Sequence, residues 1–374
     1  VTVATDATVT IFYHTGWEAP RLLLANEEED LWTEMLMGAT GQGLWKRVSI
    51  PSQAGSGQKS AALKFVISNG QGSVDHPPSG SHYVCPVPGG YKLQSGVLTS
   101  FSHALEPSMV VSDLDGTMVG NGPDFDGGTA AFKTYWEDSA ALSGSVLVYN
   151  TGRSIGQVVS LLEEEKQGFI AIPDVVITAV GTKIFDRKSS GKGVDLWDED
   201  TAWSARLDEK WDLEVVREAA EKAISKNDTQ CHWLDQGTEH PHRCSLSVNV
   251  GVLSSVKDDL QRAFDDADLR VKMIVSGVGE WRYLDCVASN AGKLEALEYV
   301  RRKHHIPKER CASCGDSGND TLMLAGENPA IVVGNAQPDL RDWVLHQPQT
   351  GRIVQSDAIG ARGILEGLAR LHLY

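Results

Sequence analysis

The chain has 374 residues and lacks the features that would direct it to a membrane or to nucleic acid. No apolar run approaches the roughly 20 residues that a bilayer-spanning helix needs. Cationic residues are also few, since 34 Lys and Arg stand against 50 Asp and Glu, for a formal net charge of −16. Nucleic acid and anionic membranes attract cationic surfaces, so we expect neither as a partner. An anionic substrate would need a metal ion or a few well-placed Lys and Arg side chains.

Cysteine is sparse as well, with six in the whole chain. This is too few for a disulfide scaffold of this length and predicts a reducing compartment. Cys311 and Cys314 are spaced like a redox or zinc pair, but we expect them in a strand, where three residues span roughly 10 Å. No second pair would complete a zinc site, so we interpret both as structural. Because the chain begins at Val1 rather than methionine, we expect a processed or trimmed product.

The first hundred residues predict a small β domain. Segments rich in β-branched and aromatic residues are expected as strands at 1–13, 45–50, 63–67 and 83–87. Clusters of Gly, Ser and Pro separate them, and no segment has a long helical period. Residues 1–100 therefore predict an antiparallel β-sandwich of the immunoglobulin-like kind. Residues 94–107 are expected to form the linker to the rest of the chain.

From residue 109 onward, apolar runs of strand length alternate with helical patterns. The expected strands are 108–112, 145–149, 175–179, 271–275 and 330–333. Helices are expected at 155–162 and 294–300. Such alternation predicts a Rossmann-like α/β core over 107–184 and 270–374, with ligands at the carboxyl ends of its parallel strands.

An insert interrupts this core at 185–269. It reads as a polar loop at 186–209, an amphipathic helix at 213–224, a strand at 245–250 and a helix at 256–264. An α+β insert of this size is expected to form a cap, or substrate lid, over the carboxyl edge of the core sheet.

Acidic residues follow the first strand of the core. Asp113 and Asp115 come directly after a buried apolar run, where carboxylates are costly unless a cation compensates them. Mg²⁺ prefers one or two carboxylates together with water and phosphate oxygens. Asp316 and Asp320 follow a later strand, in a loop that reads Gly-Asp-Ser-Gly-Asn-Asp. These four carboxylates predict a magnesium site.

Phosphate-binding groups occur at two other places. Thr151 and Gly152 lie between a strand and a helix and offer a hydroxyl and free amides. Lys293 begins the helix before the second acidic loop and supplies a positive charge. Each motif alone is common in structural turns, but their joint occurrence in this order points to phosphoryl chemistry.

Together these segments resemble the four motifs of haloacid dehalogenase-type phosphatases, and among these most closely the sucrose-phosphate phosphatases. The motif residues are 113–117 (DLDGT), 150–154 (NTGRS), Lys293 and 315–320 (GDSGND), and further matches occur at 180–182, 241–245, 291–293, 334–337 and 363–367. The family usually has His-Lys where this chain has His242-Arg243, and glycine where it has Leu294. The sugar thus stays open: sucrose 6-phosphate, or the phosphate of glucosylglycerol, mannosylglycerate, trehalose or another hexose.

The resemblance implies a role for each motif. Asp113 would attack phosphorus and form an aspartyl-phosphate, and Asp115 would act as general acid and then general base. Mg²⁺ would be held by Asp113, the backbone carbonyl of Asp115 and Asp316, with Asp320 ordering its waters. The implied phosphate-binding set is Leu114 (through backbone amides), Thr151, Gly152, Lys293 and Asn319. In the cap, His242 and Arg243 are candidates for sugar contacts, and structural hydrogen bonding is the alternative for both.

Residues 8–92 carry a second resemblance, to starch-binding carbohydrate-binding modules. The aromatic segments around Tyr13 and Trp32 follow the pattern of such modules in order, although Val74 stands where they have a stacking tryptophan. The resemblance implies α-glucan binding through Trp17, Trp32, Asn69 and Asp75. A starch-binding enzyme is expected in the plastid stroma of a chloroplast, with the cytoplasm as the alternative. One alternative is that the aromatic residues of this domain serve only as its hydrophobic core. Another is that the whole chain is a glucan-binding scaffold whose phosphatase site is vestigial.

Overall fold

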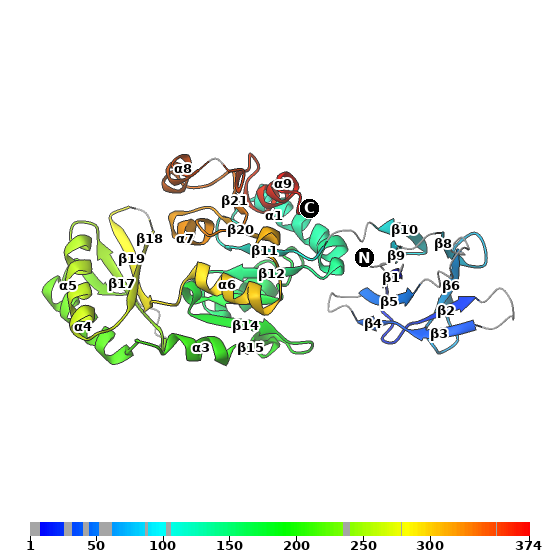
Figure 1. The fold of residues 1–374 in the computed structure, drawn as a ribbon, viewed down its shortest axis with the longest axis horizontal. Coiled ribbons are helices and arrows are strands. Elements are labelled where there is room, and N and C mark those ends of the chain that lie inside the picture. Colours follow the sequence, from blue (N-terminus) through cyan, green and yellow to red (C-terminus); the bar gives the residue numbers. More distant parts are fainter. Residues whose placement is uncertain are drawn as a thin grey trace, which may run out of the picture. The chain divides into compact units, whose positions relative to one another are not determined.

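The computed structural model describes residues 8–25, 32–39, 45–51, 62–86, 89–101, 106–234, 240–277, 279–348 and 350–374. The chain divides into two compact units (Figure 1). The first comprises Val1–Glu106 and Glu137–Gly144, and the second comprises Pro107–Trp136 and Ser145–Tyr374. Within the described residues, no helix is both long enough and apolar enough to cross a bilayer.

The first unit contains two five-stranded sheets that share one hydrophobic core. The first sheet has the order β10 (Val97–Phe101), β9 (Gly89–Gln94), β1 (Thr8–His14), β5 (Trp45–Pro51), β4 (Gly38–Ala39). The second has the order β3 (Trp32–Leu36), β2 (Arg21–Ala25), β6 (Leu63–Ser68), β7 (Val74–Asp75), with β8 (Tyr83–Cys85) also paired to β6. Ile11 and Leu93 of one sheet and Leu22 and Phe65 of the other are fully buried in the same cluster. Alternate residues of each strand thus face this core.

The structure differs from the predictions for this unit in two respects. The pair β1–β9 is parallel, so an entirely antiparallel arrangement is wrong at this pair. Strand β10 occupies part of the predicted linker 94–107, because β9 and β10 form a hairpin whose turn places Ser95 and Gly96 at positive φ. A two-residue turn of this kind is a recognisable sequence signal that the interpretation missed. Residues 1–7 and 87 of the predicted strands lie outside the described residues, and the immunoglobulin-like class stays a prediction.

A segment from the middle of the chain joins the first unit. This segment, Glu137–Gly144, contains all but the first residue of the π-helical turn η1 (Trp136–Ala140) and the whole 3-10 turn η2 (Ala141–Ser143). Leu142 of this segment is buried in a cluster with Phe12 and Trp45. The first unit is therefore not the contiguous stretch 1–100 that the sequence predicted.

The core of the second unit is an eight-stranded sheet covered by helices. Its order is β15 (Trp197–Glu199), β14 (Lys183–Arg187), β13 (Val175–Thr178), β12 (Val146–Asn150), β11 (Met109–Ser112), β20 (Cys311–Gly315), β21 (Ala330–Val332), β22 (Ile353–Gln355). The helices of this part are α1 (Pro123–Tyr135), α2 (Ile155–Ser160), α3 (Thr201–Leu207), α6 (Lys293–Lys303), α7 (Thr321–Leu324), α8 (Pro338–Leu345) and α9 (Gly360–Arg370). The six strands from β13 to β22 are parallel, and the first two are antiparallel to their neighbours. The predicted α/β core is confirmed.

Chain order places β11 at the centre of this sheet. Its neighbours are β12, which follows it in the chain, and β20, which returns about two hundred residues later. The strand order therefore runs outward from β11 in both directions, with β12 on one side and β20 on the other. Open α/β sheets bind ligands at such a switch point, at the carboxyl ends of the strands.

The cap has a four-stranded antiparallel sheet with two helices on one face (Figure 1). The sheet order is β16 (Cys231–Trp233), β17 (Arg243–Asn249), β19 (Trp281–Ala288), β18 (Val271–Ser276), and the helices are α4 (Leu213–Lys226) and α5 (Leu253–Asp266). The two helices and the strand predicted at 213–224, 256–264 and 245–250 are present.

The predicted boundaries of the cap, 185–269, differ from those of the structure. The expected core strand 271–275 is wrong, because β18 pairs with β19 in the cap sheet. At the other end, β14 and β15 extend the core sheet through residues that were assigned to the insert. An apolar run of strand length shows that a strand exists but does not identify its partner.

Candidate active site

The first acidic motif turns sharply where β11 ends. Gly116 has a φ of 85°, and a Cβ atom on it would lie 2.4 Å from the Asp316 Oδ2 atom. Only glycine combines this backbone conformation with such a close approach. The Thr117 hydroxyl donates to the Asp316 Oδ1 atom at 3.0 Å. The turn thereby packs the first acidic motif against the last one.

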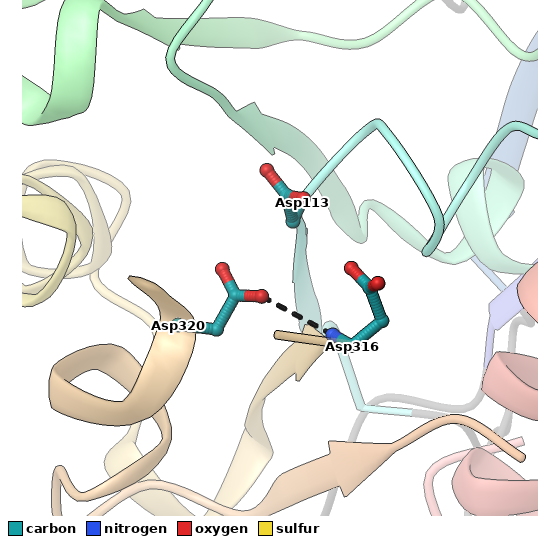
Figure 2. A group of neighbouring side chains, drawn as sticks. All are labelled: Asp113, Asp316 and Asp320. Atoms are coloured by element: carbon teal, nitrogen blue, oxygen red, sulfur yellow. Dashed lines mark hydrogen bonds between the residues drawn. The ribbon is translucent and has the colours of Figure 1, made fainter. Parts of the chain in front are cut away.

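Three predicted metal ligands lie together at this edge of the sheet. Figure 2 shows Asp113, Asp316 and Asp320, each of which has a carboxylate oxygen within 4.8 Å of one on each of the others. All three are buried, as is Lys293. The Lys293 ammonium donates to Asp113 Oδ1 at 2.8 Å and to Asp320 Oδ1 at 2.7 Å. When all three carboxylates are ionised, this buried cluster of three carboxylates and one ammonium has a net negative charge.

The pKa values reflect this net negative charge. Burial raises the pKa of Asp113 to about 7, with Lys293 opposing the rise and Asp320 adding to it. Burial also raises the pKa of Asp316 to about 6, again with a contribution from Asp320. Burial alone would lower the pKa of Lys293, but Asp113 and Asp320 outweigh it and raise the pKa. Lys293 therefore stays charged, and a further cation would stabilise the ionised carboxylates.

The hydrogen bonds indicate which oxygens could hold that cation. Asp320 uses both of its oxygens, because Oδ1 accepts from Lys293 and Oδ2 accepts from the backbone amides of Asp316 and Ser317 at 3.1 and 3.2 Å (dashed line in Figure 2 for Asp316). Asp113 and Asp316 each keep an Oδ2 atom that accepts no hydrogen bond from the described residues. This donor set fits Mg²⁺, which takes one or two carboxylates and completes its shell with water and phosphate oxygens. Asp113 and Asp316 would bind it directly, and Asp320 would orient the site.

Asp115 lies outside the carboxylate cluster. Its side chain is 57% exposed and accepts two hydrogen bonds from Arg153, at 2.9 Å from Nε and 2.7 Å from Nη2. Sequence reasoning missed Arg153 as a partner of the predicted acid and base, although it belongs to the Thr-Gly-Arg-Ser motif. A metal role for Asp115 through its backbone carbonyl stays a prediction.

The predicted phosphate-binding groups surround the same edge. Thr151 and Gly152 follow β12, and Ser154 caps the helix α2 in a capping box with Gln157. The amides of Leu114 and Gly152 donate to no other group among the described residues, which leaves both available to an anion. Asn319 lies in the loop after β20, where its side-chain oxygen accepts from Ser317. The structure therefore brings this predicted set to one edge of the sheet.

A strained turn links the phosphate loop to Lys293. Ala179, Val180 and Gly181 follow β13 with φ values of 51°, 61° and 85°, a left-handed conformation that is costly for a β-branched residue. A Cβ atom on Gly181 would lie 2.3 Å from the carbonyl of Gly292, the residue before Lys293. The Val180 amide donates to the Thr151 carbonyl at 3.2 Å. The turn thus contacts the segments that carry Thr151 and Lys293. Its only signal in the sequence was the family resemblance at 180–182 (Val-Gly-Thr).

In the cap, the two candidate sugar residues differ in their surroundings. His242 is buried, and its Nε2 atom lies 2.7 Å from Asp208 Oδ1, so this ring nitrogen is already used. Arg243 is half-buried at the start of β17, and its guanidinium makes no hydrogen bond or ion pair within the described residues. Arg243 is therefore the better placed of the two to contact a ligand.

In the first unit, three of the four predicted glucan-binding residues make internal contacts. Both Asp75 oxygens accept tyrosine hydroxyls, from Tyr13 at 2.8 Å and Tyr83 at 2.7 Å. Asn69 accepts the amides of Gln71 and Ser73 in a turn, and Trp17 packs against the hydrophobic core. Trp32 is 46% exposed, and its ring lies 5.3 Å from that of His82.

Known families provide an independent comparison. A family model described as sucrose-6F-phosphate phosphohydrolase matches residues 106–372, which include the whole carboxylate cluster. The chain belongs to this family. The match begins where the second unit begins and leaves out the β strands before it.

Two curated relatives illustrate the range of the family. A probable sucrose-phosphatase 1 from Arabidopsis thaliana is 30% identical over 272 residues, which cover 71% of this chain and 60% of that protein. A mannosylfructose-phosphate phosphatase from Agrobacterium fabrum is 26% identical over 261 residues, which cover 70% of this chain and 95% of that protein. The chain thus spans about three fifths of the length of the plant relatives it matches.

A solved structure confirms the fold of the second unit. The sucrose-phosphatase from Synechocystis sp. PCC6803, determined in complex with sucrose and phosphate, matches with a TM-score of 0.58 at 24% identity. The match covers 71% of this chain and 98% of that one. At this identity the likeness establishes the haloacid dehalogenase-like α/β fold.

Proposed function

We propose that this protein is a Mg²⁺-dependent sugar-phosphate phosphatase that works through an aspartyl-phosphate. The proposal depends chiefly on one observation: Asp113 lies at the central switch point of the sheet with Lys293 and the other two carboxylates around it. A carboxylate approaches a phosphate dianion only when nearby cations neutralise the charge. Membership of the phosphohydrolase family supports the same chemistry.

In the proposed reaction, a carboxylate oxygen of Asp113 forms the new bond to phosphorus as the bond to the sugar oxygen breaks. Lys293, Thr151 and the amides of Leu114 and Gly152 bind the phosphate oxygens. Asp115 gives its proton to the departing sugar oxygen and later takes one from the water that hydrolyses the aspartyl-phosphate. Arg153, which pairs with Asp115, orients this carboxylate between the two steps. Bound Mg²⁺ would neutralise charge on the transferred group.

For the substrate, the names of the relatives favour a disaccharide phosphate. The plant relatives are named for sucrose and the Agrobacterium relative for mannosylfructose, and both of these sugars contain fructose. We therefore propose sucrose 6-phosphate or a similar disaccharide phosphate as the substrate. Phosphates of glucosylglycerol, mannosylglycerate and trehalose are the alternatives.

Phosphate release from a panel of esters tests this proposal. The panel contains sucrose 6-phosphate, mannosylfructose phosphate, trehalose 6-phosphate, fructose 6-phosphate and p-nitrophenyl phosphate. We expect kcat/KM to be highest for a disaccharide phosphate, to fall at least about 100-fold on chelation and to recover with Mg²⁺. Ca²⁺ should inhibit, because its larger and looser coordination shell misplaces the nucleophile. Activity that persists in excess chelator would contradict the metal-dependent mechanism.

For the first unit, we propose weak binding of starch or another α-glucan, with a plastid location and the cytoplasm as the alternative. The supporting observation is the exposed Trp32 ring beside His82, since sugar faces stack on exposed aromatic rings. One such platform implies an affinity on the order of −4 to −8 kcal/mol, or millimolar to micromolar.

Retention on amylose tests this second proposal. The intact chain should be retained, and Trp32→Ala should lose retention with an unchanged melting temperature. Trp17→Ala serves as the contrast, because Trp17 packs on the core and its loss should lower stability first. Point variants are preferable to truncation, because removal of residues 1–106 would uncover Leu142. An intact chain that passes through amylose unretained would refute glucan binding.

A further inference from the structure

A histidine of the cap contacts the catalytic core at the turn after β13. His240 precedes strand β17 of the cap and is half-buried. Its Nε2 atom lies 3.2 Å from the hydroxyl oxygen of Thr182, a fully buried residue of the core that is 58 positions earlier in the chain. Thr182 directly follows the strained turn η4 (Ala179–Gly181). The contact therefore joins the cap to this turn, and the proposed mechanism does not use it.

The hydrogen bonds around His240 identify its protonation state. The Thr182 hydroxyl donates to the Ala179 carbonyl at 2.8 Å, so its oxygen accepts from the His240 ring. The His240 Nδ1 atom accepts the His242 amide at 3.4 Å. Both contacts fit one neutral tautomer, which carries its proton on Nε2. Burial lowers the pKa of His240 to about 3, and nearby positive charges add to the effect, so the ring is neutral near pH 7.

Thr182 belongs to a continuous series of hydrogen bonds that ends at Asp115. The Ala179 carbonyl accepts from Thr182, and the Ala179 amide donates to the Arg153 carbonyl at 3.1 Å. The Arg153 guanidinium in turn donates to both carboxylate oxygens of Asp115. The series thus connects His240 in the cap with the predicted acid and base of the reaction.

The turn in the middle of this series depends on its surroundings. Ala179 and Val180 have φ values of 51° and 61°, which are costly for residues other than glycine. Such a conformation persists only where neighbouring groups hold it. The Thr182 hydroxyl is one of these groups, because it donates to the Ala179 carbonyl. His240 fixes the direction of this hydroxyl by donating to its oxygen.

We propose that His240 is a positioning residue that links the cap to the general acid and base. With the cap placed as in this structure, His240 orients the Thr182 hydroxyl, the turn η4 supports the main chain of Arg153, and Arg153 presents Asp115 to the leaving oxygen. A cap displaced from this position breaks the contact with Thr182 and loosens the support of Arg153. Proton transfer is thereby coupled to the position of the cap. The inference rests on the proposed phosphatase function and deepens it, because it gives a cap residue outside the phosphate site a role in catalysis.

Kinetics on two esters test this link. The esters are the sugar phosphate that the wild type hydrolyses best and p-nitrophenyl phosphate, whose leaving group departs without a proton. For His240→Ala we expect kcat/KM for the sugar phosphate to fall about tenfold relative to that for p-nitrophenyl phosphate, because a misplaced general acid transfers its proton poorly. Thr182→Val removes the hydroxyl at the other end of the contact and should shift this ratio in the same direction.

Two further variants separate the hydrogen bond from packing. His240→Gln keeps an N–H donor close to the position of Nε2, so it should recover most of the lost ratio. Thr134→Val is the matched control, because the Thr134 hydroxyl also donates to a main-chain carbonyl, that of Ala130 at 3.1 Å, but on the exposed surface of α1. This variant should leave the ratio unchanged. Because His240 is half-buried and neutral, its replacement by alanine leaves no buried charge behind.

Double variants test the route of the coupling. His240→Ala and Thr182→Val act on one contact, so the two together should lower the ratio no further than the more severe of them alone. In an Arg153→Ala background, His240→Ala should change the ratio by less than about twofold, because the series is already interrupted before Asp115. A full tenfold change in that background would overturn the inference.

The remaining outcomes separate the inference from the function on which it rests. A His240→Ala enzyme with the ratio of the wild type would overturn the inference and leave the phosphatase intact. An equal loss on both esters, or no recovery in His240→Gln, would also overturn it, because either would indicate a structural role. A wild-type chain inactive on every ester would instead refute the proposed function, and the inference with it.

Discussion

Asp113→Asn is expected to reduce turnover of every phosphate ester by at least about 10³-fold, because the loss of a nucleophile removes most of an enzyme's rate enhancement. The amide has the shape of the carboxylate but neither attacks phosphorus nor binds Mg²⁺ well. Single-turnover phosphate release at saturating enzyme measures the effect. Activity above a tenth of the wild type would contradict the assignment of Asp113.

The fold should survive this substitution. Burial and the neighbouring carboxylates raise the pKa of Asp113, so the ionised side chain is destabilising in the absence of metal. We therefore expect the melting temperature of Asp113→Asn in chelator to equal or exceed that of the wild type. Asp195→Asn, which removes an exposed carboxylate of the second unit, serves as the matched control and should retain full activity.

Asp115→Asn should also be severely impaired, but in a way that depends on the leaving group. The predicted role of Asp115 is proton transfer to the sugar oxygen, and p-nitrophenolate leaves without a proton. The loss in the first half-reaction should therefore be larger for a sugar phosphate than for p-nitrophenyl phosphate. A loss independent of the leaving group would argue against general acid catalysis by Asp115.

Lys293→Met is expected to cause the second largest effect, on stability as well as on activity. The ammonium lies between two buried carboxylates, and its removal leaves both uncompensated. Breaking a buried ion pair in this way typically costs about 3–5 kcal/mol of unfolding free energy. Loss of a preorganised charge at the reacting group should also lower kcat at least about 100-fold. Urea unfolding at pH 8 in chelator measures the first effect.

The pH dependence of this variant has a definite sign. Lys293 lowers the pKa of Asp113, which burial raises to about 7. Without the ammonium, the folded state binds protons that an unfolded carboxyl group releases above its ordinary pKa of about 4. Stability should therefore fall as the pH rises from about 5 to 8 and recover on acidification.

A double variant separates stability from catalysis. Asp320→Asn combined with Lys293→Met removes one of the two uncompensated carboxylates, so it should restore much of the lost unfolding free energy. It should not restore turnover, because the positive charge at the phosphate is still absent. A Lys293→Met protein as stable as the wild type at pH 8 in chelator would show that the ion pairs of Lys293 with Asp113 and Asp320 contribute little to the free energy of unfolding.

The family and the α/β core could be predicted because the relevant signals are local. Asp113, Thr151 and Asp320 each follow a run of apolar residues, and parallel strands bring their carboxyl ends to one edge whatever the rest of the chain does. The helices α4, α5 and α6 were recognisable from apolar residues at helical spacing. Local pattern and strand direction were sufficient for these features.

Pairing over long distances was not predictable in the same way. The run at 271–275 is as apolar as a core strand, yet β18 joins β19 in the cap. Asp75 was predicted to bind sugar, but its carboxylate accepts a hydrogen bond from the hydroxyl of Tyr13, which lies 62 residues earlier in the chain. Leu142 likewise joins a cluster with Phe12 and Trp45 across about a hundred residues. Each outcome depends on which surfaces meet, and a one-dimensional pattern does not contain that information.

By itself, then, the sequence predicted the groups of the proposed chemistry: Asp113, Asp316 and Asp320 after the core strands and Lys293 at the start of a helix. The tertiary structure alone decided what surrounds these groups. It placed Arg153 on Asp115 and both oxygens of Asp320 in hydrogen bonds. The physical reason is that residue type and local spacing specify what a group can do. Burial, partners and charge, which decide what it does, arise only when distant segments pack together.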